Sequence, residues 1–468
     1  MESLEMGAAT SQERSGALAR AWRRLMGLRK SSMAKSAELA KRAVKLGQDD
    51  PRRVTHSLKV GLALSLVSLF YYLQPLYEGF GVNAMWAVMT VVVIFEFHVG
   101  ATFSKGLNRV LATVLGGAIG LGAHHLASLS GNTGQPIMLS FFVFLQAAGI
   151  TFMRFFPRIK AKYDYGMLIL ILTFALVSVS GFREDKIFEF AHKRLSTVVI
   201  GSSACLIVSV IVCPVWAGED LHRLIALNVE KLANFLEGFG DEYLRKLEGS
   251  DLNQDKSLFR EYKSVLETKS KEESLAIFAS WEPSHGRFGY RHPWKQYLKI
   301  GALIRQCAYR IEALDSYLTI KFHAPPQVQT RLEELCAEMG MEAARASKQL
   351  SSSLKTMTTP SSATPHLEKA RTAAKALKSL LKTTSWNHAT DLLAVVHAIT
   401  VTSLLIDVVD CTDKIAVSVN ELASLAGFKT VEKDLKCDEV VLTVAALEVT
   451  VLPESGSPLG RSDSAPVL

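Results

Sequence analysis

Charged residues are spread very unevenly along the chain. Five long segments contain no Asp, Glu, Lys or Arg: Val60–Tyr77, Gly79–Phe95, Val110–Met153, Tyr165–Phe182 and Leu195–Gly218. After Gly218 no charge-free segment of this length recurs. A helix needs about 20 apolar residues to cross the hydrocarbon core of a bilayer. The pattern therefore predicts a membrane half followed by a water-soluble half, and it excludes a wholly soluble enzyme and a disordered chain.

The apolar segments predict an all-α membrane protein with six transmembrane helices per subunit. The expected spans are residues 57–77, 82–98, 106–128, 135–156, 164–181 and 195–216. The long run Val110–Met153 must fold back once, and the Ser, Gly, Asn and Thr residues of Ser128–Gln135 favour a turn there. The second span is short, and Glu96 interrupts it near its end.

Basic residues fall on alternate connections between these spans. The N-terminal arm (residues 1–56), the connection with Lys105 and the connection with Arg158 are basic, whereas Glu78 is the only charge between the first two spans. Short cytoplasmic loops are enriched in Lys and Arg. The predicted topology therefore has both termini in the cytoplasm.

Beyond residue 217 the apolar positions follow a helical period. They begin with the stripe of Leu221, Ile225, Leu232 and Leu236, which is typical of an amphipathic helix. Further helices are expected at about 257–280, 294–319, 327–357, 365–383 and 388–426. The uncharged stretch Leu392–Ile406 is too short for a span, so we expect a buried helix.

We therefore divide the chain into four parts: the arm (1–56), a transmembrane domain (57–216), a C-terminal cytosolic helical domain (217–430) and a tail (431–468). The tail is expected to be partly disordered, with a short strand at Val440–Leu452.

Composition adds little to this division. The chain has 53 basic and 45 acidic residues, a net charge of +8 that the cytoplasmic loops largely explain, so no nucleic-acid partner is indicated. Its six cysteines show no CxxC spacing, which argues for reduced, buried thiols. HExxH, GxSxG and P-loop signatures are absent. The sequence thus predicts neither an enzyme nor a bound cofactor, and the membrane half is expected to be a conduit.

Three basic residues are candidates for an anion path. Arg109 is the last charge before the longest apolar run, at the expected cytoplasmic start of the third span, and Arg194 precedes the sixth span at its outer side. Arginine side chains near the mouths of a pore favour anions. The competing interpretation is that both reach lipid phosphates as interfacial anchors. Lys105 is a weaker candidate, because it also fits an ordinary cytoplasmic basic loop.

Three acidic residues form a second candidate group. Glu78, Asp185 and Glu189 face the outside in the predicted topology. Carboxylate oxygens are preferred ligands of hard, highly charged cations. The alternative is a solvated loop whose acids pair with Arg183, Lys186 and Lys193.

Several blocks of sequence closely resemble the plant aluminium-activated malate transporter family of anion channels, from about residue 50 to about residue 430. They include the following segments: Asp50-Pro51-Arg52-Arg53, Asn83-Ala84-Met85-Trp86, Lys105-Gly106-Leu107-Asn108-Arg109, Tyr163-Asp164-Tyr165-Gly166, Cys213-Pro214-Val215-Trp216 and Trp281-Glu282-Pro283.

The resemblance implies a homodimeric channel in the lipid bilayer that passes malate and other small anions. It implies that Arg109 and Arg194 line the anion path. Some members respond to external Al³⁺, and here the outer acids Glu78, Asp185 and Glu189 would be its candidate site. Glu272, Glu273 and Glu282 are cytosolic rivals. For them we expect helix-surface charges and, for Glu282 in the family motif Trp281-Glu282-Pro283, a contact near a helix end.

The function predicted from the sequence is passive malate efflux at the plasma membrane rather than the vacuolar membrane. Activation by extracellular aluminium is a further expectation. Three alternatives stay open: an inorganic-anion channel without aluminium gating, a membrane-anchored helical scaffold, and a proton-coupled exporter of related layout.

Overall fold

The computed structural model describes residues 35–74, 85–180, 187–248, 261–289, 291–318, 326–383 and 392–430. Within these ranges the chain is helical and contains no named strand. It divides into two compact units, Met1–Ala217 and Gly218–Leu468. Glu78, Asp185, the expected strand Val440–Leu452 and the tail 431–468 lie outside the described residues.

Among its described residues, the first unit contains a helix at 35–49 and six further helices: α2 (Pro51–Tyr72), α4 (Met85–Ile94), α5 (Val99–Ser128), α6 (Gly131–Met153), α7 (Pro157–Ser180) and α8 (Ile187–Ile211). Asp50 starts α2 because its side chain accepts a hydrogen bond from the Arg52 backbone N–H, and Pro51 takes the first helical position. The predicted turn after Ser128 is present, with Gly131 at φ +72°.

Five described helices are long and apolar enough to cross a membrane: Pro51–Tyr72, Val99–Ser128, Thr133–Met153, Pro157–Ser180 and Ala191–Ile211. The expected second span corresponds to α4, which has only 10 described residues. At 1.5 Å per residue, α4 covers about half of a hydrocarbon core roughly 30 Å thick. Six spans therefore stay a prediction, and five are supported.

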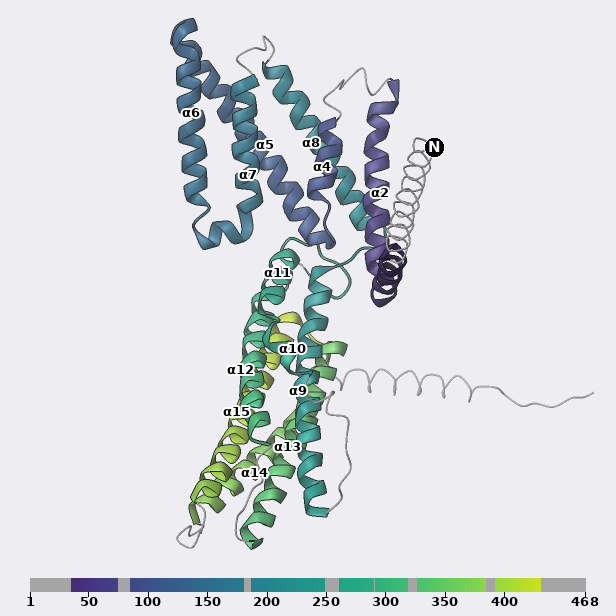
Figure 1. The fold of residues 1–468 in the computed structure, drawn as a ribbon, viewed down its shortest axis with the longest axis vertical. Coiled ribbons are helices and arrows are strands. Elements are labelled where there is room, and N and C mark those ends of the chain that lie inside the picture. Colours follow the sequence, from purple (N-terminus) through teal and green to yellow (C-terminus); the bar gives the residue numbers. More distant parts are fainter. Residues whose placement is uncertain are drawn as a thin grey trace, which may run out of the picture. The chain divides into compact units, whose positions relative to one another are not determined.

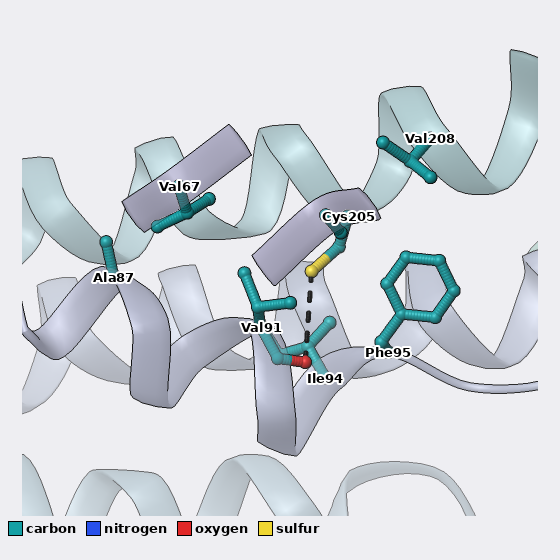
Figure 2. Packing of buried hydrophobic residues seen from close by; sticks show 8 residues of the cluster. Val67, Ala87, Val91, Ile94, Phe95, Cys205 and Val208 are labelled. Atoms are coloured by element: carbon teal, nitrogen blue, oxygen red, sulfur yellow. Dashed lines mark hydrogen bonds between the residues drawn. The ribbon is translucent and has the colours of Figure 1, made fainter. Parts of the chain in front are cut away.

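Two packed groups make up this unit (Figure 1): α2 with α4 and α8, and α5 with α6 and α7, joined by contacts of α5 with α8. Figure 2 shows the first group's core, in which Val67 of α2, Val91 of α4 and Cys205 of α8 are almost fully buried. In the second group Gly116 and Gly120 let α5 approach α7, since an added Cβ would lie 3.0 Å from Thr173 or Val177. The small-residue spacing of α5 thus serves close helix packing.

The second unit is a helical domain of α9 (Ala217–Glu248), α10 (Lys263–Leu266), α11 (Lys269–Ala279), α12 (Trp294–Leu318), α13 (Pro326–Thr356), the 3-10 helix η3 (Ser361–Ala363), α14 (Thr364–Thr383) and α15 (Leu392–Ala426). The predicted stripe of α9 is its buried face, with Leu221, Ile225 and Leu236 fully buried. The helix expected at 257–280 is interrupted: α10 ends at Leu266 and α11 starts at Lys269. The stretch Leu392–Ile406 forms the start of α15, which packs on α12 and α13. The five cysteines among the described residues are free thiols.

Candidate functional site

Arg109 lies inside the first unit and not at a helix end. It is ten residues into α5, which begins at Val99, and only 5% of its surface is exposed. Its Nη1 donates a hydrogen bond to the Tyr165 hydroxyl of α7 at 3.0 Å. Its Nε is buried and has no hydrogen-bond partner among the described residues. Arg109 therefore keeps donor capacity that an incoming acceptor can use.

Arg194 is still more enclosed. It lies seven residues into α8, is 2% exposed, and stacks its guanidinium over the Trp86 ring of α4 at 4.1 Å from the ring centroid. Its Nε and Nη1 are buried and find no hydrogen-bond partner in the part of the chain that the structure describes. The aromatic face stabilises the cation by a cation–π contact but accepts no conventional hydrogen bond. The donors of Arg194 are therefore left for another acceptor.

The structure brings the two arginines together. Their helices are in contact, with Gly106 of α5 next to Ser202 of α8. The sequence predicts one arginine at each mouth, whereas here both are buried within helices, α5 and α8, that pack on each other. Among the described residues neither has a carboxylate partner. Two buried like charges with unmet donors are costly in a low-dielectric setting, and an anion between them would relieve that cost.

Lys105 differs from the two arginines. It lies one helical turn before Arg109, its Nζ forms an ion pair with Glu96, and it lies 5.8 Å from the centroid of the Tyr165 ring. Glu96 therefore neutralises much of the charge that Lys105 would offer to an anion.

Of the three outer acids only Glu189 is among the described residues. It lies in the first turn of α8, where it is exposed and forms an i,i+4 ion pair with Lys193 at 2.8 Å. This pairing matches the solvated-loop alternative for one of the three acids. Glu78 and Asp185 lie outside the described residues, so their arrangement around a cation stays a prediction.

Glu282 of the Trp281-Glu282-Pro283 motif contacts a helix end, as the sequence predicts. Its Oε2 accepts a hydrogen bond from the backbone N–H of Gly218 at 3.0 Å, and its side chain is only 1% exposed. Gly218 is the second residue of α9, where N–H groups lack partners within the helix and negative charge is favourable. The carboxylate thus caps and stabilises the start of α9.

Glu272 is not the surface charge that the sequence led us to expect. It is fully buried in the second unit and forms an ion pair with Arg305 of α12. Thr268 donates a further hydrogen bond to its Oε1 at 2.7 Å. Glu273, the next residue, is exposed as predicted. The difference arises because α11 presents Glu272 to α12, and adjacent helical residues point to different faces.

A buried chain of hydrogen bonds links three helices of the same unit. His222 Nε2 donates to the Leu354 carbonyl at 2.6 Å, so its Nδ1 must accept from the Tyr297 hydroxyl at 2.9 Å. The Tyr297 oxygen then accepts from His292 Nε2 at 3.1 Å. Burial lowers the pKa of both imidazoles, that of His292 to about 4. Both are therefore neutral near pH 7.

The buried imidazoles predict that the helical domain loses stability on acidification. Unfolded histidine binds a proton below a pKa of about 6.5, whereas folded His292 stays neutral until about pH 4. The unfolded state therefore binds more protons in this window, and stability falls as pH falls. We expect a loss of about 2 kcal/mol between pH 7 and pH 5, measured as a lower thermal unfolding midpoint of the full-length protein in detergent.

His292→Gln is the matched variant for this prediction, because glutamine keeps an N–H donor for Tyr297 but does not titrate. It should weaken the dependence of the unfolding midpoint on pH between 7 and 5, leaving the part that His222 contributes. An unchanged slope in this variant would contradict the assignment. The carboxylates whose pKa is lowered, such as Glu342, lose their contribution to stability only below about pH 4.5, so they do not affect the comparison between pH 7 and pH 5.

Sequence reasoning finds Arg109, Arg194 and Lys105 but not the groups that hold them. Tyr165, Trp86 and Glu96 reach the three basic side chains from other helices or from the segment before α5. The aromatic residues sit in blocks that carry the family resemblance, which is the one available signal. Their role depends on which helix faces which, and a single sequence does not contain that information.

Comparisons with known proteins show the family of this chain. A family model described as "Aluminium activated malate transporter" matches residues 44–391. Aluminum-activated malate transporter 2 of Arabidopsis thaliana is 54% identical over 407 residues, 86% of this chain and 81% of that protein. Aluminum-activated malate transporter 1 of Triticum aestivum is 46% identical over 426 residues, 88% of this chain and 90% of that protein. The chain therefore belongs to the aluminium-activated malate transporter family.

Proposed function

We propose that this protein is a passive channel for malate and other small anions, built as a homodimer with both termini in the cytoplasm. The observation that carries the proposal is the pair Arg109 and Arg194. Both guanidinium groups are buried, they lie on two helices that pack on each other, and neither has a carboxylate partner among the described residues. The names of the relatives support malate as the transported anion. In this proposal the first unit is the membrane domain and the second is cytosolic.

The chemistry of the pair suits a dicarboxylate. Guanidinium groups stay charged at any physiological pH, and their planar donors match carboxylate oxygens. Tyr165 and Trp86 hold them in place without neutralising them, since a hydroxyl and an aromatic face carry no net charge. An anion entering the region replaces lost hydration with charge-assisted hydrogen bonds. Flux then follows the electrochemical gradient, with no coupled ion required.

The direct test is electrical recording of the purified protein in a planar bilayer. With malate on both sides at unequal concentrations, and an impermeant organic anion making up the difference, the current should reverse near the malate equilibrium potential. Changing the pH on one side should not move this reversal potential. A current that requires a proton gradient would instead support an exporter, and the absence of current from correctly inserted protein would support a scaffold.

We further propose that external Al³⁺ activates the channel through Glu78, Asp185 and Glu189. Their carboxylates are the outer acids of the proposed topology and suit a hard trivalent cation. The combined variant Glu78→Gln, Asp185→Asn and Glu189→Gln should abolish activation by Al³⁺ in oocyte recordings and retain the basal malate current.

The exposed Glu273 is the matched control for this variant, because it is an acid assigned to the cytosolic side. Glu273→Gln should respond to Al³⁺ like the unmodified protein. A triple variant that is still activated would exclude the outer acids. The buried carboxylates of Glu272 and Glu282 are occupied by Arg305 and by the start of α9, which makes them poor substitutes.

A further inference from the structure

The helix at 35–49 separates polar from apolar side chains almost completely. At about 100° per residue, Leu39, Ala43 and Leu46 lie on one side, and Ala40 and Val44 continue that surface. The charged residues occupy the other side: Lys35, Glu38, Lys41, Arg42, Lys45 and Asp49. Four basic residues against two acidic ones leave this face with a net positive charge. Such a division is typical of helices that lie at a membrane surface.

The apolar face of this helix is bare. Leu39 is 68% exposed, Val44 60% and Leu46 52%. An uncovered apolar face of this kind is unfavourable in water, because burying these side chains away from water would lower the free energy. The arrangement calls for an apolar surface that covers Leu39, Val44 and Leu46 together.

The position of the helix in the chain identifies that surface. Only Asp50 separates it from Pro51, the first residue of the membrane span α2. Gly47, in the middle of the apolar face, lies against Val54 of α2, since an added Cβ would be 3.1 Å from Val54 Cγ2. Val54 begins the exposed stripe of α2 that continues through Leu58, Leu62 and Leu66. The bare face is therefore continuous with a surface that faces lipid in a membrane span.

The charges point to one leaflet. Lys35, Lys41, Arg42 and Lys45 are all exposed, and Arg52 and Arg53 follow at the start of α2. Arg42 forms an ion pair with Glu38 of the same helix at 2.6 Å, and both side chains of that pair are exposed. The cytoplasmic leaflet carries anionic lipids that attract basic segments next to a span.

We infer that residues 35–49 form an in-plane membrane-surface helix, with Leu39, Val44 and Leu46 in the acyl boundary and its basic residues on anionic headgroups of the cytoplasmic leaflet. The choice of leaflet rests on the proposed orientation. The lipid contact itself does not depend on malate conduction. The helix holds the start of α2 at the interface, as a second anchor beside the span.

Spin labels on the full-length protein in lipid nanodiscs test this inference. Single cysteines would replace Leu39, Leu46, Lys41 and Lys45 one at a time. In the background protein Cys437 and the exposed Cys213 are changed to Ser, and the other four cysteines are buried. Accessibility to oxygen, which partitions into lipid, is compared with accessibility to a water-soluble nickel chelate. With phosphatidylserine in the disc, the oxygen-to-nickel ratio should be several-fold higher at 39 and 46 than at 41 and 45.

The contrast should fall toward one in pure phosphatidylcholine, and likewise in 1 M NaCl, where the screening length is about 3 Å. Four equally water-accessible labels would overturn the inference. Labels at 39 and 46 that neither reagent reaches would show a protein partner instead and would also overturn it. A contrast undiminished in phosphatidylcholine would exclude the anionic headgroups. None of these measurements requires a channel current. The experiment can therefore contradict this inference without contradicting the channel proposal, and the reverse also holds.

Discussion

Replacing Arg194 with alanine is expected to reduce malate current by about tenfold or more at malate concentrations below saturation. A hydrogen bond to a charged group contributes about 1.5–3 kcal/mol, and 1.4 kcal/mol is a factor of ten in affinity. Arg194 is 2% exposed, and within the described ranges its Nε and Nη1 have no hydrogen-bond partner. Its loss therefore removes donors that the fold itself does not use. Arg109→Ala should act in the same direction, and Lys105→Ala less, because Glu96 already neutralises Lys105.

The matched control is Arg158→Ala, which removes the same side chain from an exposed position near the start of α7. It should leave the current unchanged. Arg194→Lys separates charge from geometry, since lysine keeps the charge but not the planar donors, and it should retain part of the current. Normal currents from both Arg109→Ala and Arg194→Ala, with surface expression verified, would exclude the pair from the anion path.

Sequence reasoning works best in this protein where burial follows a simple period. The stripe from Leu221 to Leu236 predicts the buried face of α9 because one helix packs on one core. Charge-free runs predict the long spans in a similarly direct way, since length and apolarity are the main requirements for crossing the lipid. The shorter α4 is harder, because packing against α2 and α8 supports it as much as its own apolar length does.

The site is less predictable because it depends on helix limits and on partners far away in the chain. Arg109 stands next to a charge-free run, which suggests a helix start, but α5 begins ten residues earlier at Val99. Helix limits respond to caps and local contacts, and here Thr102 Oγ1 accepts a hydrogen bond from the Glu96 N–H just before the helix. The adjacent residues Glu272 and Glu273 look equivalent in sequence. The contacts of Glu272 with Thr268 and with Arg305, 33 residues later, distinguish the two.

The largest stability effect is expected from Glu272→Ala. The carboxylate is fully buried and holds Arg305, whose side chain is 13% exposed. Removing one partner of a buried pair leaves an uncompensated charge and costs about 3–5 kcal/mol. For a domain of this size the unfolding midpoint should fall by roughly 10 °C, measured by tryptophan fluorescence of the full-length protein. Glu273→Ala, the exposed neighbour, should change the midpoint little.

A double-mutant cycle with Gly301 distinguishes this contact from a general loss of packing. Gly301 of α12 faces Glu272 so closely that an added Cβ would collide with the carboxylate. Gly301→Ala alone should therefore destabilise the domain by displacing the ion pair. In the Glu272→Ala background the carboxylate is gone, so the added methyl group has room and its cost should shrink. Strictly additive midpoint changes would show that Gly301 and Glu272 are uncoupled, which would contradict the packing of α11 on α12 at this position.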